Sequence, residues 1–281
     1  MSRVYRALEK AEEEKKQKIK EERSPKLFEE RIILKEETPP LRFHEEEKIE
    51  RIELPSNGEG PFLFVPPRSF AGEEFRKLKT QIFHRLPNPP HSILVTSATP
   101  EEGKTTVAVN LAAAISQEIN RKVILIDGDL RKPSIHLKKN QSSKGLSNYL
   151  SDGIPLSEVL FKSEVENLQV ITAGSPTSRS SELIGSKRMG ELLKSLREVG
   201  DNTYIIIDSP PIISTTDPTL LAKMVDGIIL VVMADRTPKE SIQRSVKSID
   251  RQKIIGVVFN RVDIKKSSHY SKYNYYKYYE K

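Results

Sequence analysis

From residue 70 onward, short apolar runs alternate along the chain with longer segments in which apolar positions recur at helical spacing. Apolar runs without polar alternation are typical of strands that are buried on both faces of a sheet. We therefore expect strands at residues 92–97, 123–126, 168–172, 204–207, 228–233 and 254–259. We expect helices at residues 71–85, 105–117, 187–199, 218–224 and 239–251. Strands that alternate with helices predict an α/β fold with a doubly wound, mostly parallel sheet.

The first 69 residues lack this alternation. Residues 1–24 predict a charged helix whose apolar positions share one face only over its first turns, so docking to a partner and a frayed terminus both remain open. Residues 25–69 are rich in proline and charge, which predicts a flexible linker with short extended pieces. The folded domain is therefore expected at residues 70–264. Residues 265–281 form a low-complexity tail of Tyr, Lys and Ser, which we expect to be disordered.

Composition narrows the chemistry. A chain of 281 residues accommodates one α/β domain with extensions. It contains no cysteine and five scattered histidines, which excludes disulfides and makes a zinc site a poor hypothesis. The formal net charge of +7 is compatible with nucleic acid, anionic lipid or phosphate ligands, and equally with simple solubility. Without a long apolar stretch or a signal peptide, we expect a cytoplasmic protein that reaches a membrane only through a partner or surface charge.

The chemically most informative segment is residues 97–106, S-A-T-P-E-E-G-K-T-T, between an expected strand and an expected helix. It fits the phosphate-loop pattern A-x4-G-K-T of P-loop NTPases. Gly103 permits the tight turn that points backbone N–H groups inward, Lys104 places a charge against the phosphates, and the Thr105 hydroxyl can bind Mg²⁺. The pattern predicts that ATP is bound by Ala98, Pro100, Glu101, Glu102, Gly103, Lys104, Thr105 and Thr106.

Three aspartates follow two of the expected strands. Asp127 and Asp129 come after the strand at 123–126, and Asp208 comes after the strand at 204–207. In open α/β sheets, ligands bind beyond the carboxyl ends of the strands. Asp208 can hold Mg²⁺, and Asp127 can do the same or take a proton from an attacking hydroxyl. A single aspartate at a strand end is usually a helix cap, but three in a chain with a phosphate loop favour chemistry.

These residues resemble a known family. Residues 98–105, 127–131 and 205–208 are similar to the Walker A, Walker A′ and Walker B motifs of bacterial tyrosine kinases, the autokinases of exopolysaccharide and capsule synthesis. The resemblance covers about residues 70–281. It implies transfer of the γ-phosphate of ATP, with Mg²⁺, by Lys104, Asp127, Asp129 and Asp208, and metal binding by Thr105, Asp127 and Asp208.

The same resemblance implies partners. Glu73, Arg76 and Lys79 resemble the segment through which the family assembles into rings, with Lys79 in place of an arginine. Asn260 resembles the position that reads adenine. A membrane chain-length-determinant (co-polymerase) protein is the implied activator, which would hold the chain at the inner face of the plasma membrane. A cognate tyrosine phosphatase is also implied, and no nucleic acid is expected.

Six of the nine tyrosines lie at the end of the chain: Tyr270, Tyr273, Tyr275, Tyr276, Tyr278 and Tyr279. A Tyr/Lys tail could stack on single-stranded nucleic acid, rest on an anionic membrane or serve as the phosphate acceptor. The family resemblance favours the acceptor. Each phosphate would add about −1.5 to −2 charges, so a few would reverse the sign of the tail.

Two other functions remain as alternatives. The first is a partitioning or positioning ATPase, a dimeric nucleotide switch of the same fold. That group usually carries an extra lysine five places before the P-loop lysine, where this chain has Thr99. The second is a scaffold that binds nucleotide without chemistry. Thr99 and the tyrosine-rich tail both favour the kinase.

Overall fold

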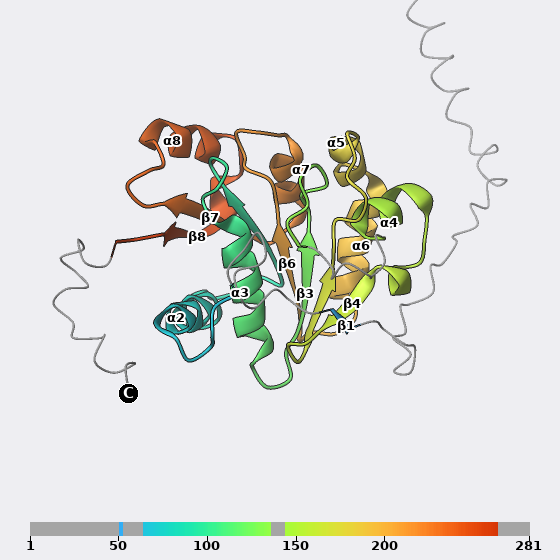
Figure 1. Cartoon of the computed structure of the whole chain (residues 1–281), viewed down its shortest axis with the longest axis horizontal. Coiled ribbons are helices and arrows are strands. Elements are labelled where there is room, and N and C mark those ends of the chain that lie inside the picture. Colours follow the sequence, from blue (N-terminus) through green and yellow to red (C-terminus); the bar gives the residue numbers. More distant parts are fainter. Residues whose placement is uncertain (1–50, 53–63, 136–143, 264–281) are drawn as a thin grey trace, which may run out of the picture. The chain divides into compact units, whose positions relative to one another are not determined.

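The computed structural model describes residues 51–52, 64–135 and 144–263 (Figure 1). The described residues form one eight-stranded sheet, whose strands lie side by side in the order β1-β4-β5-β3-β6-β2-β7-β8. Its strands are β1 (Arg51–Ile52), β2 (Ser92–Ser97), β3 (Lys122–Asp127), β4 (Leu160–Ser163), β5 (Leu168–Ile171), β6 (Thr203–Asp208), β7 (Gly227–Met233) and β8 (Ile254–Asn260). Neighbouring strands are parallel except β4 and β5, which are antiparallel. The predicted doubly wound, mostly parallel α/β fold is confirmed.

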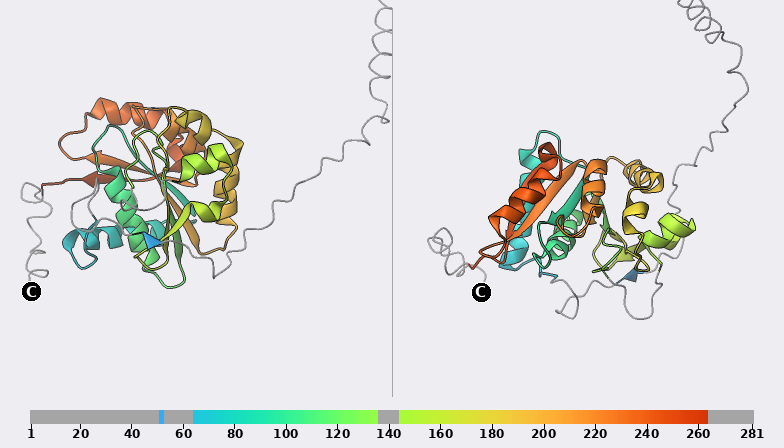
Figure 2. Two further views of the ribbon diagram at one scale, coloured as in Figure 1. Left: turned by 45° about the vertical axis from the view of Figure 1, so that its right-hand side comes forward. Right: turned by 90° about the horizontal axis from the view of Figure 1, so that it is seen from above.

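Helices cover both faces of the sheet (Figures 1 and 2). They are α2 (Phe70–Arg85), α3 (Lys104–Ser116), α4 (Leu146–Asp152), α5 (Ser180–Ile184), α6 (Lys187–Arg197), α7 (Asp217–Met224) and α8 (Lys239–Lys247), with 3₁₀ helices η1 (Leu156–Glu158) and η2 (Arg251–Lys253). Successive strand residues point to opposite faces, so Ile93 and Val95 pack with α2 and α3, whereas Leu94 packs with the layer of α4 to α7. None of these helices is long and apolar enough to cross a membrane.

The central helix α3 is apolar on nearly every side, because it is enclosed by the sheet and α2. Eleven of its residues are buried: Thr105 and every residue from Val107 to Ser116. The helix therefore cannot shift without disturbing the core. Its amino end, where Lys104 begins the first turn, is thus held rigidly at the carboxyl end of β2.

Some elements carry no repeating pattern and were not predicted. They are β1, β4, α4, α5 and the two 3₁₀ helices. The last predicted helix, 239–251, ends early at Lys247. The reason is local: the Asp250 side chain accepts a hydrogen bond from the backbone N–H of Gln252 and starts the separate turn η2.

Parts of the predicted linker before residue 70 contact the folded domain. Within the predicted linker, Arg51–Ile52 pair with β4, and the backbone N–H of Val65 donates to Asn110 Oδ1 at 2.9 Å. Phe64 also packs against the core. Short extended pieces were expected in this linker, but they have no periodicity from which their positions could be predicted. The helix predicted at 1–24, the rest of the linker up to residue 63, and the tail at 265–281 lie outside the described residues.

Candidate functional site

The central strands bring the candidate residues to one edge of the sheet. β6 lies between β3 and β2, and all three run in the same direction. In the register of this sheet, Asp127 at the end of β3 lies directly beside Asp208 at the end of β6. The loop that follows β2 leads into Lys104 at the start of α3. Motifs that are far apart in the sequence thus lie together at the carboxyl ends of three neighbouring strands.

Thr105 and Asp208 are in direct contact. The Thr105 hydroxyl donates to Asp208 Oδ2 at 2.6 Å, and both side chains are buried. The other carboxylate oxygen, Asp208 Oδ1, is buried and has no hydrogen-bond partner among the described residues. A buried oxygen without a partner costs free energy unless a ligand satisfies it. A hydroxyl beside such a carboxylate fits Mg²⁺, which prefers hard oxygen ligands.

Within the described residues, no group of three or more His, Cys, Asp or Glu side chains is arranged to hold a metal ion. A cation at Thr105 and Asp208 would therefore need further oxygens from water and from a phosphate. Mg²⁺ in nucleotide sites is commonly bound in this way, through one or two protein ligands.

Electrostatics at this edge are dominated by burial. Burial raises the pKa of Asp208 to about 7, with the positive charge of Lys104 opposing the shift and the negative charge of Asp127 adding to it. Burial likewise raises the pKa of Asp127 to about 6, against hydrogen bonds from backbone N–H groups. Lys104 therefore lies near enough to Asp208 to influence its ionisation. Without a bound cation, Asp127 and Asp208 are therefore less ionised near neutral pH than two exposed aspartates would be.

Asp127 organises the loop that follows it. Its Oδ1 accepts from the backbone N–H of Asp129 at 3.0 Å, and its Oδ2 accepts from those of Ser134 and Ile135, each at 2.9 Å. Asp129 is buried and accepts from the backbone N–H of Lys132 at 2.9 Å. Both aspartates thus shape the loop, in addition to any contact with ligand that the sequence predicts.

Two residues that the sequence assigns to nucleotide contact also brace the phosphate loop. The Glu102 side chain is buried, and its carboxylate accepts from the backbone N–H of Thr99 at 2.8 Å and from the Thr237 hydroxyl. Asn260 Nδ2 donates to the backbone oxygen of Glu102 at 2.9 Å. The loop is therefore held to the segment that follows β7 and to the end of β8. Contact between Asn260 and adenine stays a prediction.

The remaining loop residues differ in exposure. Ala98 is fully buried, whereas Pro100 and Glu101 are exposed, and Glu101 has a left-handed backbone with φ 64°. The Thr106 backbone oxygen accepts from Asn110 Nδ2 at 2.7 Å. Gly103 also has a left-handed backbone, with φ 88°. Its place is tightly filled, because a Cβ there would lie 2.0 Å from Asn260 Nδ2.

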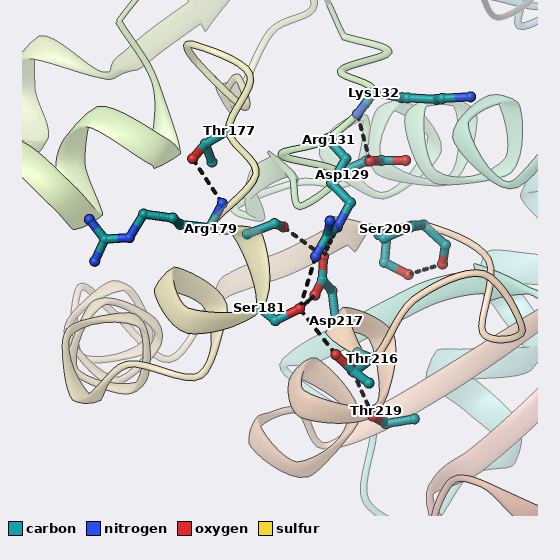
Figure 3. Close-up of polar contacts among 12 residues, drawn as sticks. Asp129, Arg131, Lys132, Thr177, Arg179, Ser181, Ser209, Thr216, Asp217 and Thr219 are labelled. Carbon is teal, nitrogen blue, oxygen red and sulfur yellow. Dashed lines mark hydrogen bonds and ion pairs between the residues drawn. The ribbon is translucent and has the colours of Figure 1, made fainter.

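A second polar cluster lies beside this site, and sequence reasoning missed it (Figure 3). Asp217, at the start of α7, is fully buried. Its Oδ2 accepts from Ser180 at 2.6 Å, its Oδ1 from Ser181 at 2.5 Å, and Arg131 Nε lies 3.4 Å from Oδ2. The only signal in the sequence is an aspartate before a proline at a helix start, which by itself predicts a cap.

The three residues predicted to form a ring contact do not act as one group. Glu73 and Arg76 pair with each other on α2, and both are partly exposed. Lys79 instead pairs with Glu118 at 2.9 Å, and only 13% of its side chain is exposed. Glu118 also binds Arg121 at 2.7 Å, so Lys79 joins α2 to the end of α3 within the same chain. A ring contact stays a prediction, and the surface that could make it is that of Glu73 and Arg76.

Comparison with known proteins identifies the family. A family model described as an AAA domain matches residues 95–255. The tyrosine-protein kinase YwqD of Bacillus subtilis is 34% identical over 214 residues, which cover 75% of this chain and 88% of the relative. The chain belongs to the bacterial tyrosine-protein kinases. The solved kinase domain of the Escherichia coli tyrosine kinase ETK agrees: it is 30% identical, with a TM-score of 0.61, covering 68% of this kinase and 77% of that chain. The family is one of P-loop proteins that bind nucleotides, and binding by the loop at 97–106 stays a prediction.

The raised pKa of Asp208 leads to a stability prediction. In the nucleotide-free kinase, Asp208→Asn should raise the melting temperature by roughly 5 °C at pH 8 and by little at pH 4. The unfolded chain releases this proton near pH 3.8 and the folded chain near pH 7. The wild-type contribution to stability is therefore fully present below about pH 4 and is lost as the pH rises through about 7. Thermal unfolding at the two pH values measures this.

Asp226→Asn is the matched control, with the opposite sign. Burial opposes the shift at Asp226, but hydrogen bonds from Ser92 and the charge of Arg197 together lower its pKa. Its contribution is present above the unfolded pKa and lost as the pH falls, so this variant should destabilise the kinase more at pH 8 than at pH 4. If both variants shift stability in the same direction at pH 8, the assignment of a strained buried charge to Asp208 is wrong.

Proposed function

We propose that the kinase transfers the γ-phosphate of ATP to tyrosines in its own C-terminal cluster, residues 270–279, and that this transfer regulates exopolysaccharide or capsule synthesis. The observation that carries the proposal is the convergence of Lys104, Thr105 and Asp208 at adjoining strand ends. An anion-binding loop that faces a hydroxyl and a buried carboxylate suits a magnesium nucleotide. The family gives the acceptor class, and the tyrosine cluster gives a local acceptor.

In this proposal the residues divide the work as follows. Lys104 and the loop N–H groups stabilise negative charge on the transferring phosphoryl group. Thr105 and Asp208 would hold Mg²⁺, which neutralises charge on the phosphate oxygens. The tyrosine oxygen forms a bond to the γ-phosphorus while the bond to the bridging oxygen breaks, and ADP leaves. The phenol, with a free pKa near 10, gives its proton to a carboxylate of the Asp127 and Asp129 pair. Asp129 is the better candidate for the proton acceptor, because the carboxylate of Asp127 already accepts hydrogen bonds from three backbone N–H groups.

A nucleotide switch of the partitioning or positioning type is the alternative. The solved cell-division ATPase MinD of Pyrococcus furiosus is 21% identical with a TM-score of 0.51, a likeness that concerns the fold alone. Thr99 occupies the place of the extra lysine of that group, and its backbone N–H donates to Glu102. A lysine at this position could make the same backbone hydrogen bond, so it is the missing lysine side chain that favours the kinase.

The proposal extends to partners. We expect a membrane co-polymerase protein to activate the kinase at the inner face of the plasma membrane, and a cognate phosphatase to reverse the modification. We expect rings in which one subunit's tail reaches the site of the next, with Glu73 and Arg76 at the contact. The family resemblance supports these expectations, together with the exposed Glu73–Arg76 pair on α2.

Replacing all six tail tyrosines with phenylalanine should remove nearly all labelled phosphate incorporated from ATP·Mg²⁺, because the acceptor oxygens are gone while the nucleotide site is untouched. The matched control is Tyr149→Phe, which removes a hydroxyl from a tyrosine whose ring packs beneath Arg188. This variant should incorporate phosphate as the wild type does. Incorporation at the wild-type level in the six-phenylalanine variant would show that the acceptor lies elsewhere.

A further inference from the structure

Asp217 is a fully buried carboxylate that the proposed reaction does not use directly. It is the first residue of α7, where a negative charge is favoured by the helix dipole. A helix start alone does not require burial, and a buried charge is costly unless hydrogen bonds compensate it. Here the compensating groups come from two other segments of the chain. Asp217 is therefore a junction of three segments rather than a simple cap.

The first segment is the loop that carries Asp129. Arg131, two residues further on, points its guanidinium toward Asp217, with Nε 3.4 Å from Oδ2 (Figure 3). The Arg131 side chain is 40% exposed, so this ion pair adds little stability by itself. The ion pair instead fixes the orientation of the loop that carries Arg131, because a guanidinium is planar and donates hydrogen bonds in a fixed geometry.

The second segment is the turn that leads into α5. Ser180 and Ser181 both donate to Asp217, and Arg131 Nη2 donates to Ser181 Oγ at 3.1 Å. The backbone N–H of Thr177 also donates to the backbone oxygen of Leu130 at 3.0 Å, directly between Asp129 and Arg131. The Asp129 loop is therefore braced against the 177–181 segment by side chains and by backbone.

We propose that Asp217 is a positioning residue for the acceptor side of the kinase: through Arg131, Ser180 and Ser181 it fixes the loop that presents Asp129 to the incoming tyrosine. This inference rests on the proposed phosphotransfer to tyrosine. None of these contacts involves the phosphate loop, which Glu102, Thr237 and Asn260 brace separately. The two halves of the site thus have separate supports, so catalysis and nucleotide affinity should respond separately.

The test compares Asp217→Asn, Arg131→Gln and the double variant in the full chain. Each single variant should lower kcat at saturating ATP·Mg²⁺ at least tenfold while the Kd for ADP·Mg²⁺ stays within twofold. The double variant should be no slower than the slower single variant, because both changes break one connection. Asp226→Asn, which breaks an Asp–Arg pair with Arg197, should leave kcat unchanged. Additive losses in the double variant, an unchanged kcat, or a parallel loss of ADP affinity would each overturn the inference.

Hydrogen exchange provides a readout that does not depend on activity. In Asp217→Asn, backbone amides of residues 128–135 and 177–181 should exchange faster, whereas those of residues 99–106 should be unchanged. Ser181→Ala, which removes one hydroxyl, should show a smaller change of the same pattern if the asparagine variant folds poorly. If the wild type incorporates no phosphate, the proposed function fails. If exchange at 128–135 is unaffected, the positioning role fails whatever the activity.

Discussion

Replacing Lys104 with methionine should lower phosphate transfer by roughly 10³-fold while the kinase remains folded. Methionine keeps most of the length of the side chain but removes the charge that stabilises the transferring phosphoryl group. The fold should tolerate the change, because Lys104 is only partly buried at the first turn of α3 and the core is formed by the residues after it. The measurement is the initial rate of labelled-phosphate incorporation, with thermal unfolding to confirm folding.

Lys122→Met is the matched control for this experiment. Lys122 is an exposed residue at the beginning of β3, the opposite end of the strand from Asp127. The same substitution there removes the same charge from the protein without touching the nucleotide loop, so the rate should be that of the wild type. If Lys104→Met retained more than about a tenth of the wild-type rate, the assigned role of Lys104 would be wrong.

Replacing Gly103 with alanine should weaken nucleotide binding roughly 10²-fold. The left-handed backbone at φ 88° disfavours any Cβ, and here the added atom would also lie 2.0 Å from Asn260 Nδ2. The loop must then shift or lose the Asn260 hydrogen bond to Glu102, and either change misdirects its N–H groups. Titration with ADP·Mg²⁺ measures the loss.

Gly190→Ala provides the comparison. Gly190 lies within α6, and a Cβ added there meets nothing within 4 Å among the described residues. Alanine in a helix interior should stabilise the kinase by about 0.5–1 kcal/mol and leave ADP affinity unchanged. Wild-type affinity in Gly103→Ala alone would contradict the geometry of the loop.

Much of the fold could be predicted because the sheet is buried on both faces. Each central strand is then an apolar run, and the strand predicted at 92–97 has the observed bounds of β2. The phosphate loop could be predicted because its chemistry needs a fixed spacing of Gly103, Lys104 and Thr105. Strand ends of parallel neighbours meet at one edge, which is why Asp127 and Asp208 could be brought together before the structure was known.

The rest depended on contacts between distant segments. The contact between Glu102 and Thr237 joins residues 135 positions apart, and nothing local to Glu102 distinguishes a ligand contact from a buried brace. Asp217 is a helix start in the sequence, and only the fold brings Arg131 to it. Lys79 continues the spacing of Glu73 and Arg76, yet it faces Glu118 at the end of the next helix. Regular spacing along one helix therefore does not show that the side chains contact the same partner.

The central claim is that the strand-end cluster of Lys104, Thr105 and Asp208 directs the γ-phosphate of ATP to tyrosine rather than to water. The most direct measurement follows that phosphate, by incubating the full chain with ATP·Mg²⁺ and comparing phosphotyrosine in the peptides of residues 265–281, by mass spectrometry, with inorganic phosphate released. The account predicts that most of the phosphate is recovered on the tail and that none appears there with Lys104→Met. Recovery of the γ-phosphate only as inorganic phosphate, with an unmodified tail, would contradict it.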